Sequence, residues 1–149
     1  MKESQGTTVY LKNYRVPDYL IDETHLLVQL HEDHALVTSR LLLRRNPASA
    51  EKQAPLILDG RQMELVSLAL DGNKLAAEAY AADNQHLTIA SVPEKFQLEC
   101  ITRIKPQENT SLEGLYKSRV MFCTQCEAEG FRKITYYLDR PDVLASFTT

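Results

Sequence analysis

An all-β fold, built as an antiparallel sandwich or a stack of curved sheets, is predicted by two features of the sequence. The first is strict alternation along residues 96–104, where one face of a strand would carry Phe96, Leu98, Cys100, Thr102 and Ile104. This period of two residues matches the alternation of side chains along a strand. The second is that short strand-like segments recur about every ten residues, with turn-forming residues between them. This spacing favours antiparallel pairing over a parallel α/β fold.

Turn-forming residues divide the first two-thirds of the chain into strands. The alternation between Leu26 and Arg44 changes parity at Glu32-Asp33-His34, which predicts a hairpin that turns there. Asp59-Gly60 and Asp71-Gly72-Asn73 are predicted turns, because glycine supplies the positive φ of a tight hairpin. The strands predicted around these turns, and after a further break at 81–84, are 56–58, 64–70, 74–80 and 87–89.

The C-terminal third is less regular. Residues 106–114 are predicted to form a loop. Residues 139–145 are predicted to form a helical turn or two near the C-terminus, with Pro141 close to the first helical position. Residues 146–149 have the pattern of an entry into a further strand.

Composition limits the classes of function. The 149 residues include 17 basic and 20 acidic side chains, a net charge of -3, and the charges are interspersed. Because no basic stripe is present, we expect no nucleic-acid partner. The apolar runs are far shorter than the roughly 20 residues that span a bilayer, and residues 1–6 lack the apolar stretch of a signal peptide. We therefore expect no membrane association and a cytoplasmic location. The three cysteines of the chain are expected to be reduced.

Two groups of metal-ligating residue types favour ordinary structural roles. His31 and His34 lie three positions apart in a predicted turn, which differs from the helical spacing of four in zincins. We therefore expect a solvent-exposed turn. Cys123 and Cys126 have CxxC spacing, but neither the βαβ setting of a redox motif nor a second ligand pair is evident. A structural role is favoured for these thiols, with a thiol or zinc protein as the weaker alternative.

Gln125, Glu127 and Glu129 form a polar cluster whose role the residues alone leave open. On a loop, either carboxylate could converge with the carboxamide of Gln125. A hydrogen-bonded loop is the commoner arrangement for such residues, and a ligand site is the alternative. The charged pairs Lys117-Ser118-Arg119 and Arg132-Lys133 are predicted to be solvated surface, since each is far smaller than a polybasic patch.

The motifs resemble the N-terminal domain of bacterial aminopeptidase N, a zinc metallopeptidase of the gluzincin type. The resemblance is carried most specifically by NTSLEGLY at 109–116 and CTQCEAEGFRKITYYLDRPDV at 123–143, with further matching segments at 14–19 and 92–96. It implies a saddle-like all-β domain that packs over a catalytic domain of the same polypeptide. The whole enzyme would release single amino acids from peptide N-termini.

Two residues acquire roles through this resemblance. It implies that Gln125 lines the pocket for the first side chain and that Glu127 binds the free α-amine of the substrate. The zinc of the parent enzyme would be held elsewhere, because the sequence contains neither HExxH nor GxMEN. We therefore expect no catalytic residue, metal ligand or cofactor in this chain, and no peptide hydrolysis by the chain alone.

The resemblance also bears on domain limits and on one loop. We expect residues 1–149 to be a truncated N-terminal β domain, without the catalytic and C-terminal domains. Relatives usually have glycine where Arg119 stands, so we expect the loop that leads to Gln125 and Glu127 to be displaced, because arginine takes a positive φ only with strain. The alternative is a self-contained β-sandwich that binds another protein and has no catalytic role.

Overall fold

The computed structural model describes residues 10–149, so the N-terminal residues that were examined for a signal peptide lie outside the described range. Strands dominate that range, which confirms the all-β prediction. The strands are β1 (Tyr19–Leu30), β2 (Ala35–Arg45), β3 (Leu56–Asp59), β4 (Glu64–Leu70), β5 (Asn73–Lys74), β6 (Tyr80–Ala82), β7 (His86–Ile89), β8 (Lys95–Ile104), β9 (Gly114–Ser118), β10 (Met121–Gln125) and β11 (Ser146–Thr148). Single 3-10 turns occur at η1 (Leu11–Asn13), η2 (Ala77–Ala79) and η3 (Phe131–Lys133). No helix within residues 10–149 has the length and apolar character needed to cross a membrane.

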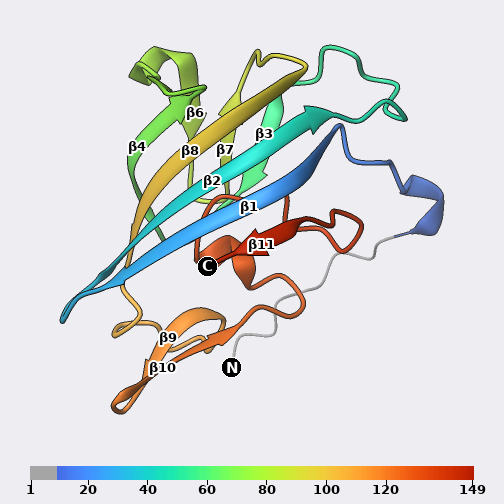
Figure 1. Cartoon of the computed structure of the whole chain (residues 1–149). Coiled ribbons are helices and arrows are strands. Elements are labelled where there is room, and N and C mark those ends of the chain that lie inside the picture. Colours follow the sequence, from blue (N-terminus) through green and yellow to red (C-terminus); the bar gives the residue numbers. More distant parts are fainter. Residues whose placement is uncertain (1–9) are drawn as a thin grey trace.

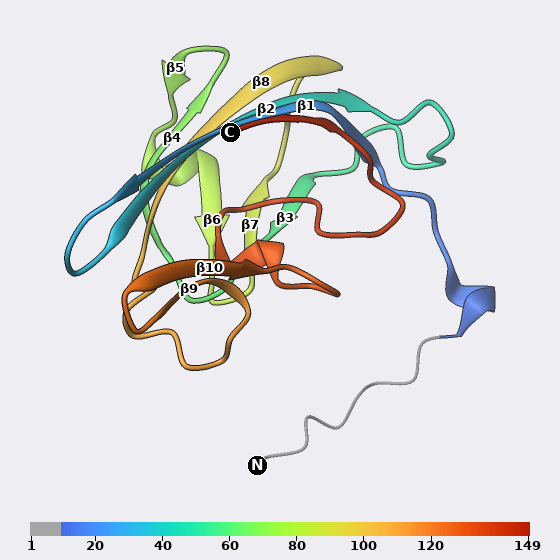
Figure 2. The same cartoon turned by 60° about the horizontal axis from the view of Figure 1, so that its bottom comes forward.

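The largest sheet has the strand order β11-β1-β2-β8-β4-β5. Its pairs are antiparallel except for the short parallel pair between β11 and β1. The register shifts between Ile21 and Glu23 in β1 and between Leu65 and Ser67 in β4. Irregularities of this kind bend a strand and increase its twist. Figures 1 and 2 show the outcome, a sheet in which β1, β2 and β8 arch over the rest of the chain.

Two smaller sheets lie beneath this arch in Figure 2. One is the three-stranded sheet β3-β7-β6, and the other is the β9–β10 hairpin. Between the large and the three-stranded sheets lies the main core, whose fully buried side chains include Tyr19, Ile21, Leu41, Leu43, Leu56, Leu58, Leu68, Leu87 and Leu98. A second apolar cluster attaches the β9–β10 hairpin to the arch and contains Ala35, Val37, Ile104, Leu115 and Ile134.

Hydroxyl groups on the inner face of the large sheet hold the segment that follows η3. The Thr135 hydroxyl donates a hydrogen bond to Ser39 Oγ on β2 at 3.1 Å, and the Thr102 hydroxyl on β8 donates to the Ile134 carbonyl at 3.3 Å. Ser39, Thr102 and Thr135 are fully or almost fully buried. We call these three residues the hydroxyl seam. Because a buried hydroxyl without a partner is costly, the seam fixes where this segment lies on the sheet.

The hairpins predicted at 31–34 and 71–73 and the predicted strand 96–104 are confirmed. β1 and β2 are joined by a turn at 31–34, in which the His31 N–H donates to the His34 carbonyl at 2.9 Å. Asp71 and Gly72 both have positive φ, at 49° and 79°, as expected for a two-residue turn between β4 and β5. The alternating residues of β8 that were predicted to face inward are all buried.

Three local predictions are wrong. The predicted strand 74–80 does not form, because the chain leaves the large sheet after β5, passes through η2 and joins the three-stranded sheet at β6. Residues 139–145 form a hydrogen-bonded turn, in which the Val143 N–H donates to the Arg140 carbonyl, and not a helix. The Arg140 guanidinium holds the side chain of Asp142 at 2.7 Å, and the chain then turns directly into β11. At Asp59-Gly60, the glycine does not have a positive φ. Gly60 is required there because the ring of Tyr136 occupies the space of a side chain.

Candidate functional site

The β9–β10 hairpin brings the polar cluster to the surface. Its register runs without interruption from the Ser118–Met121 pair at the turn to the Gly114–Gln125 pair at the open end. Arg119, the first residue of the two-residue turn, has φ 57°. Arginine therefore takes the left-handed conformation for which glycine is favoured, and the displacement of this loop relative to that of relatives stays a prediction.

Replacing Arg119 with glycine is expected to raise the free energy of unfolding by about 1 kcal/mol, because the left-handed conformation penalises a side chain. Urea unfolding of the polypeptide that carries this domain would measure the change. Val120 is the matched control, since it follows in the same turn without a positive φ. Glycine at Val120 should bring no gain, and equal effects at the two positions would contradict the explanation.

Gln125 ends β10, and a tight turn follows it. The Gly130 N–H donates to the Cys126 carbonyl at 2.8 Å, which closes a loop over residues 126–130. Within this loop the Gln125 side chain donates from Nε2 to the Glu127 carbonyl at 3.2 Å, and the peptide bond between Glu127 and Ala128 is cis. We call residues 125–130 the site loop. The structure thus joins Gln125 to the main chain of Glu127.

The two carboxylates of the site loop have different surroundings. The carboxylate of Glu129 lies 3.5 Å from Nη1 of Arg132. Glu127 is exposed, and within residues 10–149 its carboxylate takes part in no hydrogen bond or ion pair. A carboxylate without a partner keeps its full charge available for a ligand, whereas the charge of Glu129 is partly offset. The residue types alone did not separate these two acids, and the structure does.

The prediction that Arg132-Lys133 is solvated surface is wrong for Arg132. Only 8% of Arg132 is exposed. Its Nε donates to Asp139 Oδ2 at 2.9 Å, its Nη2 donates to the Asp139 carbonyl at 3.0 Å, and Asp59 lies 3.7 Å from Nη1. Burial lowers the pKa of the guanidinium, but Asp139, Asp59 and Glu129 outweigh that effect and leave the pKa raised. The guanidinium can be buried because the negative charges of these acids offset its positive charge.

Gly130 is a second residue whose importance was missed. A Cβ at this position would overlap the Gln125 carbonyl oxygen and lie 3.0 Å from Cys126 Cα and 3.1 Å from the Gly114 nitrogen. All three atoms belong to the main chain, so none can move aside as a flexible side chain would. In the sequence, the only indication was a glycine directly after a polar run. Such a glycine can mark a close backbone approach.

The three cysteines are free thiols. Cys100 is fully buried in β8, and desolvation raises the pKa of its thiol to about 12. Desolvation, with a smaller effect of Asp139, also raises the pKa of Cys126. A raised pKa means less thiolate, which is the form that reacts with disulfides and binds metals. The structural interpretation of Cys100 and Cys126 is therefore favoured over the redox interpretation.

His31 and His34 lie in the turn between β1 and β2, as predicted. Their rings stack with centroids 4.5 Å apart, and His34 Nδ1 is 2.6 Å from the carboxylate of Asp33. No group of three or more possible metal ligands occurs among residues 10–149. The described part of the chain therefore contains no complete set of ligands for a zinc ion.

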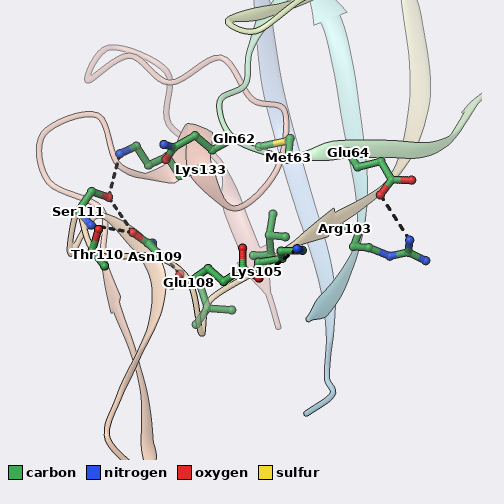
Figure 3. A pocket seen from close by; sticks show the side chains of 12 residues that line it. Gln62, Met63, Glu64, Arg103, Lys105, Glu108, Asn109, Thr110, Ser111 and Lys133 are labelled. Carbon is green, nitrogen blue, oxygen red and sulfur yellow. Dashed lines mark hydrogen bonds and ion pairs between the residues drawn. The ribbon is translucent and has the colours of Figure 1, made fainter. Parts of the chain in front are cut away.

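Two cavities flank the β9–β10 hairpin. The larger, about 480 Å³, lies between β4, the end of β8 and the loop before β9. Figure 3 shows that its charged groups already have partners, with Arg103 paired to Glu64 and Lys133 bonded to Ser111. The smaller, about 280 Å³, lies beside Cys126 of the site loop and is mainly apolar, with Leu26, Val28, Phe131 and Phe147 among its other lining residues.

Comparison with known proteins decides the family. Residues 23–149 match the model of the peptidase M1 N-terminal domain. The chain belongs to this family. It is 44% identical to aminopeptidase N of Caulobacter vibrioides over 148 residues, which cover 99% of this chain and 17% of the relative. It is 46% identical to aminopeptidase N of Escherichia coli over 145 residues, which cover 97% of this chain and 16% of the relative. This M1 N-terminal domain thus spans a small part of the length of these relatives.

Solved structures agree with the fold. Legionella pneumophila aminopeptidase A, in complex with aspartic acid, superposes with a TM-score of 0.86 at 32% identity over 92% of this chain and 16% of that chain. Native yeast LTA4 hydrolase superposes with a TM-score of 0.69 at 19% identity over 87% of this chain and 22% of that chain. The second likeness supports the fold alone. Each of these chains thus contains a region with the arched all-β fold of this domain.

Proposed function

We propose that this M1 N-terminal domain recognises the substrate in a zinc aminopeptidase that releases N-terminal amino acids from peptides. Its partners would be the peptide N-terminus and a catalytic domain of the same polypeptide, which would supply the zinc ion. The proposal includes a cytoplasmic location and a role in peptide catabolism. It is supported by relatives named aminopeptidase N, of which this chain would be one part.

The observation that carries the proposal is the exposed carboxylate of Glu127 on a well-held loop. An exopeptidase must distinguish a charged terminal ammonium from an uncharged internal amide. At about 4 Å and an effective dielectric constant near 20, a carboxylate attracts an ammonium by about 4 kcal/mol. A peptide with a blocked N-terminus would leave this carboxylate desolvated and unpaired, so it would bind poorly.

Gln125 has a different role in this proposal. Its side chain is exposed at the end of β10, and its one hydrogen bond within the described residues goes to the main chain of Glu127. The Oε1 atom of the same side chain remains available to face the first side chain of a peptide. We assign Gln125 to the lining of the pocket for that side chain. The alternative of a self-contained β-sandwich that binds another protein is less well supported, because the relatives that match nearly the whole length of this chain are named aminopeptidase N.

The test compares two isosteric variants in the full-length polypeptide. Glu127→Gln is expected to lower kcat/KM on an aminoacyl substrate about a hundredfold, because the loss of about 3 kcal/mol of ammonium binding appears in that ratio. Glu129→Gln, two residues away, should change kcat/KM less than about threefold, because its carboxylate already faces Arg132 and its side chain is largely exposed. An unchanged kcat/KM in Glu127→Gln would remove the proposed role.

A further inference from the structure

One buried cation, Arg132, ties the end of the site loop to the rest of the domain. Arg132 lies two residues beyond Gly130, in the middle of η3. Its guanidinium holds both the side chain and the carbonyl of Asp139, a residue that follows the segment bound by the hydroxyl seam. The same guanidinium lies 3.7 Å from Asp59 at the end of β3. One side chain therefore ties the exit of the site loop to two separate parts of the fold.

The main chain of Arg132 is held as well. Its N–H donates to Asp139 Oδ2 at 3.2 Å, and its carbonyl accepts a hydrogen bond from the Arg61 N–H at 2.8 Å. Both the backbone and the guanidinium are thus engaged at one residue. Such double attachment leaves little freedom at the C-terminal end of the site loop, which is where the loop would otherwise pivot.

Arg132 also reaches back into the loop itself. Its Nη1 is 3.5 Å from the Glu129 carboxylate, and Glu129 is two residues from Glu127. The contact draws the second acid of the loop toward the domain. It leaves Glu127 as the acid that points to solvent without a partner among residues 10–149.

We propose that Arg132 is a positioning residue, which fixes the site loop so that the Glu127 carboxylate meets the substrate ammonium. This inference rests on the proposed function of Glu127. Lysine cannot replace arginine here, because a single ammonium lacks the planar set of donors that binds the carboxylate and the carbonyl of Asp139 together. A loop held less firmly would weaken the contact with the amine, while contacts with the rest of the ligand would remain.

The test uses two competitive inhibitors of the full-length enzyme, phenylalaninamide and 3-phenylpropionamide, which differ only in the α-amine. The ratio of their inhibition constants measures recognition of the amine. We expect Arg132→Lys to weaken phenylalaninamide about tenfold and 3-phenylpropionamide less than twofold. The matched control is Arg140→Lys, because Arg140 also holds an aspartate, Asp142 at 2.7 Å, but lies outside the site loop. This control should leave the ratio unchanged.

A double-mutant cycle with Glu127→Gln separates positioning from general damage. If Arg132 acts through Glu127, Arg132→Lys should change the ratio no further once Glu127 is glutamine. Equal weakening of both inhibitors by Arg132→Lys, or additive effects in the cycle, would overturn the positioning role. A ratio that Glu127→Gln alone leaves unchanged would instead overturn the proposed function. If the lysine variant does not fold, Asp139→Asn replaces it with the same expectation, since it keeps Arg132 but removes the carboxylate that holds it at 2.9 Å.

Discussion

Replacing Tyr136 with alanine is expected to lower the free energy of unfolding of this domain by about 3 to 5 kcal/mol, the usual cost of deleting a buried aromatic ring. Tyr136 is only 3% exposed and belongs to the main core. Its ring occupies the space that a side chain at position 60 would need, so residue 60 must be glycine while Tyr136 is present. Urea unfolding of the polypeptide that carries the domain would measure the loss.

Two further variants test the cause of this loss. Tyr136→Phe keeps the ring, and the Tyr136 hydroxyl makes no hydrogen bond within residues 10–149, so this variant should cost less than about 1 kcal/mol. Gly60→Ala should be strongly destabilising in the natural background and much less so when Tyr136 is alanine, because the methyl group can then enter the space of the ring. Additive costs for Gly60→Ala and Tyr136→Ala would contradict this packing explanation.

The second large effect is expected at Gly130. Replacing it with alanine should cost about 3 kcal/mol, at the upper end of the range for overpacking, because the added Cβ would meet main-chain atoms of Gln125, Cys126 and Gly114. The site loop would have to open, so kcat/KM should fall in the same variant. Unfolding in urea and steady-state kinetics of the full-length polypeptide would measure both effects.

Gly72 provides the matched control for Gly130. It has φ 79°, but a Cβ there would find no atom within 4 Å, so Gly72→Ala carries only a conformational cost of about 1 kcal/mol. Gly130 has φ -85°, so its cost is purely spatial. A Gly130 variant no less stable than the Gly72 variant, with normal kinetics, would show that the loop is looser than the structure indicates.

Periodicity predicted most of the fold, because the alternation of apolar residues reports directly which face of a strand is buried. This is why β8 and the hairpin of β1 and β2 were correctly predicted. Residues 139–145 were mispredicted because Pro141 is compatible with both a helix and a turn. In the structure Arg140 donates to the Arg15 carbonyl and Asp142 accepts a hydrogen bond from the Tyr14 hydroxyl, and a local pattern does not reveal contacts with so remote a segment.

The candidate site was predictable only in part. The resemblance singled out Gln125 and Glu127, and their roles stay predictions until they are tested by mutation. The supporting residues were not found, because their partners are remote in the sequence. Arg132 is buried and forms ion pairs with Asp59 and Asp139. Position 130 must be glycine because the backbone of Gly114 lies too close for a side chain. Contacts over such separations are created by the fold, so charge patterning alone predicted Arg132 to be solvated.

The hydroxyl seam of Ser39, Thr102 and Thr135 has a consequence for accuracy of folding. If the chain from Ile134 onward slipped by one residue along the arch, the hydroxyl of Ser39 would face an isoleucine or a tyrosine ring, and polar atoms would be sealed away without partners. Each such mismatch costs about 1 to 3 kcal/mol, so a segment bound in the wrong register is destabilised. Polar groups in this interior therefore favour a single alignment of the segment that follows the site loop.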